Sequence, residues 1–350
     1  MLPARRFNGQ YGLTDFFNDF FDNRTLEKVG SETPAINVVE NDKVGGTISI
    51  LPAGTYKLVE DITTVNSLTV DLDATVNLDL NGHTLTGADT AERAVYAKGN
   101  LYISDNAYNP ADPDAVWGKI ESGNSKNGGH SLYIGGGSRS FMFGGEIAST
   151  FQEATVAGPV GISGEFHFVG GKITGLTKTS ANGGAIIIND EGELSLWGGI
   201  VTGGKAAMGG AIYSGNAKQT INLFGNAVVA GGSAKQGGNI YCVGKLTVSH
   251  QAEVSGGESI SYGGNIYLAG DGTVSGGVIK NGTSTDTSHN GGNICVANRA
   301  TLKIPDGEIS EQAKKLYATF QDDFNNKFIP QDIRTLRYEL TNHISRPKLE

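Results

Sequence analysis

A Gly-Gly-Ala/Asn-Ile motif recurs five times in the second half of the chain and limits the fold more than any other feature. Its copies begin at Gly183, Gly209, Gly237, Gly263 and Gly291, so the steps are 26, 28, 26 and 28 residues (209−183, 237−209, 263−237, 291−263). A fixed period of this length indicates a solenoid, a propeller or another repeat array.

Short alternating segments lie between these copies. In Leu194–Trp197 and Ile221–Phe224, apolar side chains alternate with others before a glycine turn, which is the pattern of a strand followed by a turn. A helix is disfavoured because one Gly pair in a helix costs about 2 kcal/mol relative to Ala. A propeller ranks second because its blades take about 40 residues and four strands. The pattern therefore favours a parallel β-helix, whose coils stack about 4.8 Å apart.

Stacked coils would place equivalent residues above one another. The repeat predicts a buried isoleucine ladder at Ile186, Ile212, Ile240, Ile266 and Ile294. It also predicts a ladder of Asn239, Asn265 and Asn293, because stacked Asn side chains can share amide hydrogen bonds.

Residues 45–309 resemble the right-handed parallel β-helix superfamily, which includes pectate-lyase-like proteins. The Gly-Gly-Ala-Ile and Gly-Gly-Asn-Ile copies resemble repeats of bacterial polymorphic outer-membrane and adhesin-like surface proteins, and the segment 78–85 (LDLNGHTL) resembles early β-helix coils. The resemblance implies a right-handed solenoid and a cell-surface or extracellular location. We therefore expect an all-β fold, a right-handed parallel β-helix solenoid of about ten coils with short helical segments at both termini.

The two ends of the chain do not follow the repeat. In residues 1–44, helical spacing joins Leu13, Phe16, Phe17, Phe20 and Phe21. Residues 1–43 resemble the N-terminal arm of bacterial small heat-shock proteins; no α-crystallin domain follows, so chaperone activity is not implied. The four phenylalanines are predicted either to drive homo-oligomerisation or to cap the first coil. Residues 310–350 are predicted to form a helical cap, as solenoid ends require.

Composition and charge exclude several function classes. The net charge is −9, which argues against a nucleic-acid partner because phosphate binding needs a basic surface. No apolar run approaches the ~18 residues of a membrane span. Arg5 and Arg6 are not followed by the apolar segment of a secretory signal. This absence conflicts with a surface location, so the location stays open, and no motif predicts a cofactor.

The two cysteines, Cys242 and Cys295, are predicted to remain unpaired. They fall one residue out of phase in the repeat and two coils apart, or roughly 9.6 Å by strand spacing. A disulfide needs Cα atoms within about 7 Å.

No catalytic or metal site is predicted. Asp71, Asp73 and Asp79 are expected on the surface, where a solvated face is favoured over a Ca²⁺ site. Only Glu146 and Lys172 are expected to align in adjacent coils, as an ion pair, and no other acid is expected to repeat at one coil offset. His167 and His250 have no obvious acidic neighbour. The sequence leaves enzyme activity open and leans against it.

One repeat position carries tyrosine in three successive coils: Tyr213, Tyr241 and Tyr267. Each follows a ladder isoleucine and therefore points outward if the isoleucine points inward. The strip is predicted to bind a glycan or a protein partner; alternatively, its rings only stabilise the sheet. The leading function is a non-enzymatic, adhesin-like surface protein. A polysaccharide lyase or glycoside hydrolase and a self-assembling structural protein are the alternatives.

Overall fold

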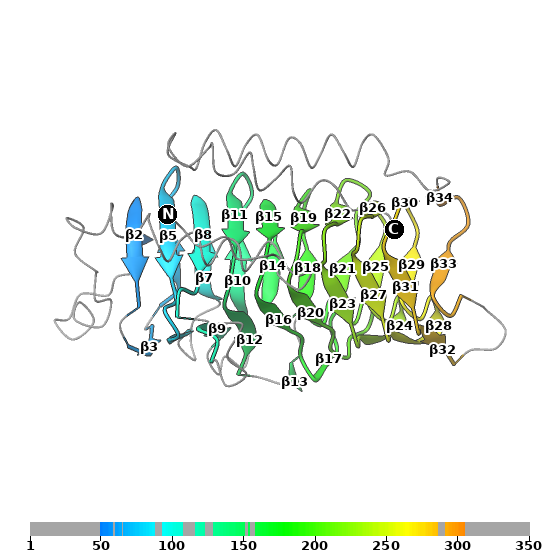
Figure 1. Cartoon of the computed structure of the whole chain (residues 1–350), viewed down its shortest axis with the longest axis horizontal. Coiled ribbons are helices and arrows are strands. Elements are labelled where there is room, and N and C mark those ends of the chain that lie inside the picture. The colour runs from blue at the N-terminus through cyan, green and yellow to red at the C-terminus, as the bar shows by residue number, and fades with distance from the viewer. Residues whose placement is uncertain are drawn as a thin grey trace, which may run out of the picture. The chain divides into compact units, whose positions relative to one another are not determined.

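The computed structural model describes residues 50–304, apart from 59, 65, 88–92, 108–115, 123–128, 151–152, 155–157 and 286–290. These residues form a parallel β-solenoid in which three long sheets run along the stack of coils (Figure 1). Each coil passes through sheet A, then sheet B, then sheet C, and the strand pairs among the described residues are parallel. The expected all-β solenoid is confirmed, and the described residues contain no helix.

Sheet A has ten strands, which pair in the order given. They are β1 (Ile50–Leu51), β4 (Leu68–Val70), β7 (Arg93–Ala97), β10 (His130–Ile134), β14 (Val160–Ile162), β18 (Ile186–Ile188), β21 (Ile212–Ser214), β25 (Ile240–Cys242), β29 (Ile266–Leu268) and β33 (Ile294–Val296).

Sheet B also has ten strands, and Figure 1 shows them following one another along the solenoid. They are β2 (Gly54–Lys57), β5 (Thr75–Asp79), β8 (Asn100–Ser104), β11 (Arg139–Met142), β15 (Glu165–Phe168), β19 (Glu193–Leu196), β22 (Thr220–Leu223), β26 (Lys245–Val248), β30 (Asp271–Val274) and β34 (Thr301–Lys303).

Sheet C has nine strands, and two short sheets, D and E, have two and three. Sheet C comprises β3 (Ile62–Thr63), β6 (Thr84–Thr86), β9 (Lys119–Ser122), β12 (Glu146–Ser149), β16 (Lys172–Thr174), β20 (Ile200–Thr202), β23 (Val228–Ala230), β27 (Glu253–Ser255) and β31 (Val278–Lys280). Sheet D comprises β13 (Glu153–Ala154) and β17 (Lys178–Thr179), and sheet E comprises β24 (Ser233–Gln236), β28 (Glu258–Tyr262) and β32 (Thr283–Ser284).

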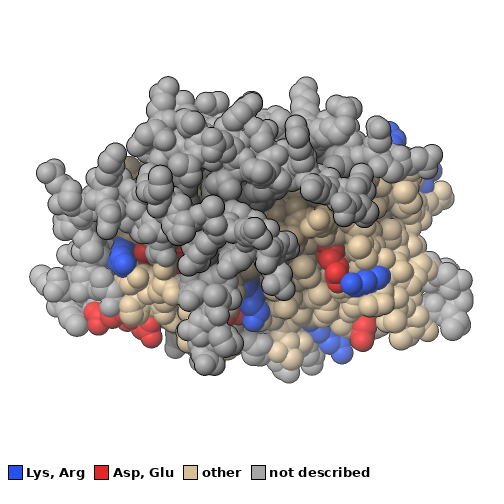
Figure 2. Space-filling model, viewed as in Figure 1, with Lys and Arg blue, Asp and Glu red and all other residues tan. Residues whose placement is uncertain are grey.

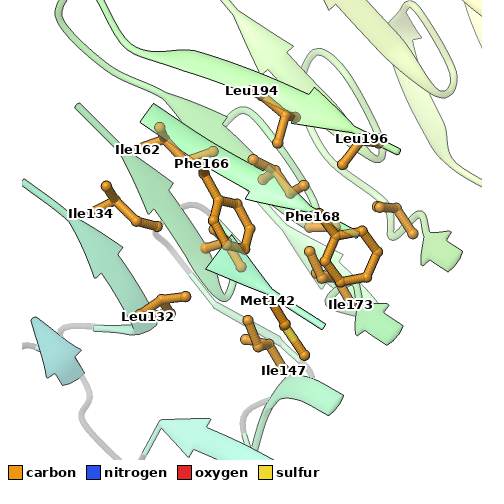
Figure 3. Close-up of a cluster of buried hydrophobic side chains, with 14 of the residues drawn as sticks. Leu132, Ile134, Met142, Ile147, Ile162, Phe166, Phe168, Ile173, Leu194 and Leu196 are labelled. Atoms are coloured by element: carbon orange, nitrogen blue, oxygen red, sulfur yellow. The ribbon is translucent and has the colours of Figure 1, made fainter. Parts of the chain in front are cut away.

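The core fills the space between the three long sheets. Inward side chains from each sheet interdigitate there, as Figure 3 shows for Ile134, Met142, Phe168, Ile173 and their neighbours. The isoleucine ladder is confirmed: its members pair coil by coil, and those from 186 to 266 are at most 1% exposed. Ile294, in the last strand of sheet A, is only partly buried. Full burial of one such side chain stabilises the fold by about 1.5–3 kcal/mol.

The asparagine ladder is confirmed as well. Asn239 Nδ2 donates to Asn265 Oδ1 at 2.8 Å, and Asn265 Nδ2 donates to Asn293 Oδ1 at 2.9 Å. Asn239 and Asn265 are fully buried. Because a buried amide without partners would cost about 1–3 kcal/mol, these bonds let a polar column run inside the solenoid wall.

The ladder also closes the base of a series of excursions between sheets C and A. Asn239 Oδ1 accepts from Gly232 N, Asn265 Oδ1 from Gly257 N, and Asn293 Oδ1 from Gly282 N, at 2.8–2.9 Å. A strand of sheet E follows each of these glycines, outside the three long sheets. We call these three strands and their connections to sheet A the fin.

A turn at residues 72–73 divides the alternating run from Leu68 to Leu80 and leaves Leu72 65% exposed. Asp79 was predicted on the surface, and this was wrong. It is 2% exposed because Oδ1 accepts from Asn81 N and Asn106 N, and Oδ2 accepts from Asn106 Nδ2. Asp71 and Asp73 are exposed, as expected.

The predicted domain limits at 45 and 309 and both helical ends lie outside the described residues, as do Phe16, Phe17, Phe20 and Phe21. The right hand of the coil stays a prediction, supported by the strong preference of parallel crossovers for that hand.

Candidate binding face of sheet A

A single outer column of side chains runs across sheet A, and the predicted tyrosines belong to it. Strand pairing aligns Thr69, Tyr96, Tyr133, Gly161, Ile187, Tyr213, Tyr241, Tyr267 and Cys295, in that order. In the three tyrosine strands from β21 to β29, both flanking side chains are buried and the tyrosine between them is partly exposed. The column therefore faces outward, as the repeat predicted.

Tyr213, Tyr241 and Tyr267, called here the tyrosine strip, stack on one another. The ring centroids lie 5.3 Å apart for Tyr213–Tyr241 and 5.1 Å for Tyr241–Tyr267, with interplanar angles of 18° and 17°. Each face of the middle ring is therefore occupied by a neighbour. A ligand on the strip would meet ring edges and phenolic hydroxyls rather than open ring faces.

The phenols of the strip influence one another electrostatically. Burial raises the pKa of Tyr241, and the neighbouring Tyr267 and Tyr213 raise it further. Burial likewise raises the pKa of Tyr267, with additions from Cys295 and Tyr262. Tyr241 and Tyr267 are therefore held as neutral phenols, which suits a hydroxyl-rich ligand.

The fin supplies a further ring that the repeat does not predict. Tyr262 in β28 lies 5.9 Å from the Tyr267 ring, at an interplanar angle of 51°. Tyr262 comes just before the glycine pair and Tyr267 just after it, so one turn brings both rings together. In one continuous strand, side chains five residues apart would point to opposite faces. The contact therefore depends on the turn between them.

The outer column carries two more tyrosines, which the repeat does not predict either. Tyr96 and Tyr133 pair in register and their rings meet edge to face, with centroids 5.6 Å apart. The Arg93 guanidinium carbon lies 4.7 Å from the Tyr96 centroid and 4.4 Å from the Tyr133 centroid. These two tyrosines are 37 residues apart (133−96) rather than 26 or 28, so the regular period could not align them.

Gly161 makes room for this group. A Cβ atom there would lie 2.6 Å from Tyr133 Cδ2 and 2.8 Å from His130 Nε2. The Tyr133 hydroxyl shares a 2.7 Å hydrogen bond with Ser163 Oγ in the next coil. The Tyr133 ring thus lies along the sheet, toward the next coil.

On sheet B, the expectation that no acids align was wrong. Glu165 and Glu193 pair in register, and their 28-residue step (193−165) was the signal that could have revealed this. Glu165 Oε2 accepts from Arg139 Nε at 2.5 Å and lies 3.8 Å from His167 Nε2, so His167 does have an acidic neighbour. The His167 hydrogen bond, helped by Arg139 and opposed by burial, lowers the pKa of Glu165 to about 2.

Neighbouring polar side chains do not complete a nucleophilic site. Ser195 pairs in register with His167. However, His167 Nδ1 accepts from Trp197 Nε1 at 3.4 Å while Nε2 faces Glu165. Ser195 Oγ instead donates to Glu193 Oε1 and accepts from Asn222 Nδ2. Since both His167 nitrogens are engaged, neither is placed to take a proton from Ser195.

The predicted ion pair on sheet C is confirmed. Lys172 Nζ lies 3.3 Å from Glu146 Oε1, and Lys119 Nζ lies 3.6 Å from Oε2. Burial opposes ionisation of Glu146, but the Thr174 hydrogen bond and the two lysines outweigh it and lower its pKa. On the face seen in Figure 2, charged side chains lie in small groups of mixed sign.

The remaining predictions concern metals, thiols and membranes. No group of three or more metal-ligating side chains occurs within the described part of the chain. Cys242 and Cys295 are free thiols, as predicted. Among residues 50–304 as described, no helix has the length and apolar character needed to cross a membrane.

Comparison of the chain with protein-family models, with curated proteins and with solved structures found no match. The solenoid fold is therefore shown by the structure alone. The similarities to the parallel β-helix superfamily and to the small heat-shock arm rest on sequence motifs only.

Proposed function

We propose that this protein is a non-enzymatic binding protein, adhesin-like in mode, that holds a ligand along the outer column of sheet A. The observation that carries the proposal is the tyrosine strip, where three rings from successive coils stack in one row on the outer face of sheet A. Tyrosine offers an apolar body and a polar tip, which suits binding surfaces.

A glycan fits this row better than a peptide. The rings repeat at 5.1–5.3 Å, which is close to the length that one hexose adds to an extended 1,4-linked chain. A peptide strand laid along the same axis advances about 3.3 Å per residue, so its side chains would fall out of step with the rings. We therefore favour a linear glycan that runs along the solenoid.

The alternative of a glycoside hydrolase has one observation in its favour, the register of Glu165 and Glu193. Such enzymes use two carboxyl groups, one of which is a general acid with a raised pKa. The low pKa of Glu165, about 2, keeps that carboxylate ionised. The arrangement supports an ion pair with Arg139 better than acid catalysis.

Two triple variants test the proposal on an array of linear glycans. Tyr213→Ala, Tyr241→Ala, Tyr267→Ala removes rings and hydroxyls and is expected to weaken binding at least tenfold. Tyr213→Phe, Tyr241→Phe, Tyr267→Phe keeps the stack and removes only the hydroxyls; it should weaken binding while retaining the parent melting temperature.

The Ala variant should also lose some stability, because cross-strand aromatic pairs contribute about 0.2–1 kcal/mol each. A double variant on sheet B, Thr247→Ala, Thr273→Ala, is the control and should bind like the parent. A parent that binds no glycan, with an Ala variant that only melts earlier, would leave the tyrosines as structure.

A further inference from the structure

A second row of side chains runs beside the tyrosine strip. It consists of the residues that come just before three of the glycine pairs, and we call it the flanking row: Met208, Gln236 and Tyr262. Met208 pairs in parallel with Gln236, and Gln236 pairs in parallel with Tyr262. Paired residues of parallel strands lie on the same face. Because the Tyr262 ring contacts the Tyr267 ring, the whole flanking row faces the tyrosine strip.

One turn conformation brings the two rows together in each coil. The first glycine of each pair has a φ of +61°, which favours glycine: Gly209, Gly237 and Gly263. A Cβ atom on Gly237 would lie 2.9 Å from the Tyr241 nitrogen, and one on Gly263 would lie 2.9 Å from the Tyr267 nitrogen. The turns are therefore equivalent and equally tight. Gln236 lies beside Tyr241 in the same way as the next residue of the flanking row lies beside Tyr267.

The side-chain amide of Gln236 is open to a ligand. Among the residues that the structure describes, none forms a hydrogen bond with this amide. The side chain is partly exposed, and neither amide atom is buried away from solvent. The hydroxyls of the tyrosine strip have the same two properties. Since a glutamine amide donates from one side and accepts on the other, Gln236 is suited to a ligand group that does both.

Met208 adds a second kind of contact one coil away, which corresponds to about 4.8 Å by strand spacing. Its flexible thioether packs well against small apolar groups. An acetamido group carries the complementary parts, because its N–H and C=O match an amide and its methyl matches a thioether. A hydroxyl group has no methyl to pack against Met208, and a carboxylate has no donor for the Gln236 carbonyl.

We infer that Gln236 and Met208 form a subsite for an acetamido group, and that the preferred glycan contains N-acetylhexosamine. Gln236 pairs with the N–H and C=O of the ligand, Met208 packs against its methyl, and the sugar rings follow the tyrosine strip. In a β-1,4-linked chain alternate units face opposite ways, so alternate acetamido groups meet the flanking row. The inference rests on the proposed function and adds the class of sugar that the strip prefers.

Two hexamers with the same β-1,4 linkage test the subsite by calorimetry, one of N-acetylglucosamine and one of glucose. They differ only in the group at C2. We expect the parent to bind the N-acetylated hexamer about tenfold more tightly, because it alone completes the hydrogen bonds of Gln236 and the contact with Met208. Gln236→Met, which removes the amide at similar length, and Met208→Ala should each lower this ratio, and the double variant should bring it close to one.

A matched pair of variants separates hydrogen bonding from added charge. Gln236→Glu keeps the shape but loses the amide donor, so it should lower the ratio as Gln236→Met does. Gln251→Glu introduces the same charge at an exposed position in the turn after β26, outside both rows, and should keep the parent ratio. Melting temperatures close to that of the parent show that the variants are folded.

The outcomes for the subsite and for the proposed function are distinguishable. Equal binding of the two hexamers, or a parent ratio in Gln236→Met, would overturn the subsite while the proposed function stood. Binding of neither hexamer would also overturn it, and the proposed function would fail as well if the glycan array showed no binding. Loss of both hexamers in the tyrosine Ala variant, with a lowered ratio in the flanking-row variants, would support both.

A peptide can carry the same acetamido group, so a hexapeptide of Nε-acetyllysine is the last probe. We expect it to bind more weakly than the N-acetylated hexamer, because its advance of about 3.3 Å per residue does not match the spacing of the coils. If the peptide alone bound, the acetamido-sugar subsite and the proposed function would both be wrong.

Discussion

His130 illustrates, at the residue scale, how the coil-to-coil contacts set the properties of one side chain. Its Nδ1 proton is used in the bond to Gly158 in the next coil, and its ring centroid lies 5.5 Å from that of Tyr133. Burial is the main cause of its lowered pKa. Protonation of His130 in the folded protein is therefore disfavoured relative to the unfolded chain.

This shift predicts an acid-dependent loss of stability. A group with a depressed folded pKa stabilises the fold above its unfolded value, about 6.5 for histidine, and that contribution is lost as pH falls through the folded pKa. The unfolding free energy should therefore decrease from pH 7 to pH 5.5, above the range where carboxylates titrate. His130→Gln, which keeps a donor for Gly158, should decrease less over this window.

Chemical denaturation at several pH values measures the effect. His250 also has a pKa lowered by burial, so His250→Gln should flatten the profile separately and the double variant should flatten it most. If the unfolding free energies of the parent and of His130→Gln fell equally between pH 7 and pH 5.5, the assigned environment of His130 would be wrong.

The sequence predicts the tyrosines of the outer column only where the repeat is regular. Tyr213, Tyr241 and Tyr267 could be predicted because each follows a ladder isoleucine at the expected step. Tyr96 and Tyr133 could not, because the long connection between β8 and β9 changes their spacing. Tyr262 could not either, since its contact with Tyr267 depends on how the glycine turn folds.

At the scale of elements, each strand is held by its neighbours in adjacent coils, and the isoleucine ladder is the clearest case. Ile240 is fully buried between Ile212 and Ile266, on strands β21, β25 and β29. Alternation of strand faces and a fixed coil length were sufficient to predict this. They were not sufficient for Asp79, whose burial depends on donors from the turn residues Asn81 and Asn106.

The ladder predicts that Ile240→Asp is severely destabilising. A carboxylate at that position would be buried and unpaired, which should lower the free energy of unfolding by several kcal/mol. Ile240→Val is the matched control and should cost only about 0.5–1.5 kcal/mol. Thermal melts followed by circular dichroism compare the two, and an Ile240→Asp protein that melts with the parent would refute the coil register.

At the scale of the whole molecule, the four phenylalanines of the N-terminal arm are predicted to control association. Replacing Phe16, Phe17, Phe20 and Phe21 with Ser is expected to lower the oligomeric state and leave the β-sheet circular dichroism unchanged, because the aromatic positions follow one helical face. Light scattering and thermal melts measure both properties. A lower melting temperature at constant mass would instead assign these residues to capping, and no change in either would exclude both roles.

The asparagine ladder has a consequence for how such a chain can diversify. The fin excursions differ in length: six residues between Gly232 and Asn239, seven between Gly257 and Asn265, and ten between Gly282 and Asn293. All three close on the same bond from a glycine amide to an asparagine carbonyl. Doubling a flexible loop adds only about 0.6 kcal/mol of closure entropy. Each excursion is thus an insertion site for foreign peptide segments, because the coil beneath it keeps its alignment. The solenoid could therefore serve as a scaffold that displays such segments.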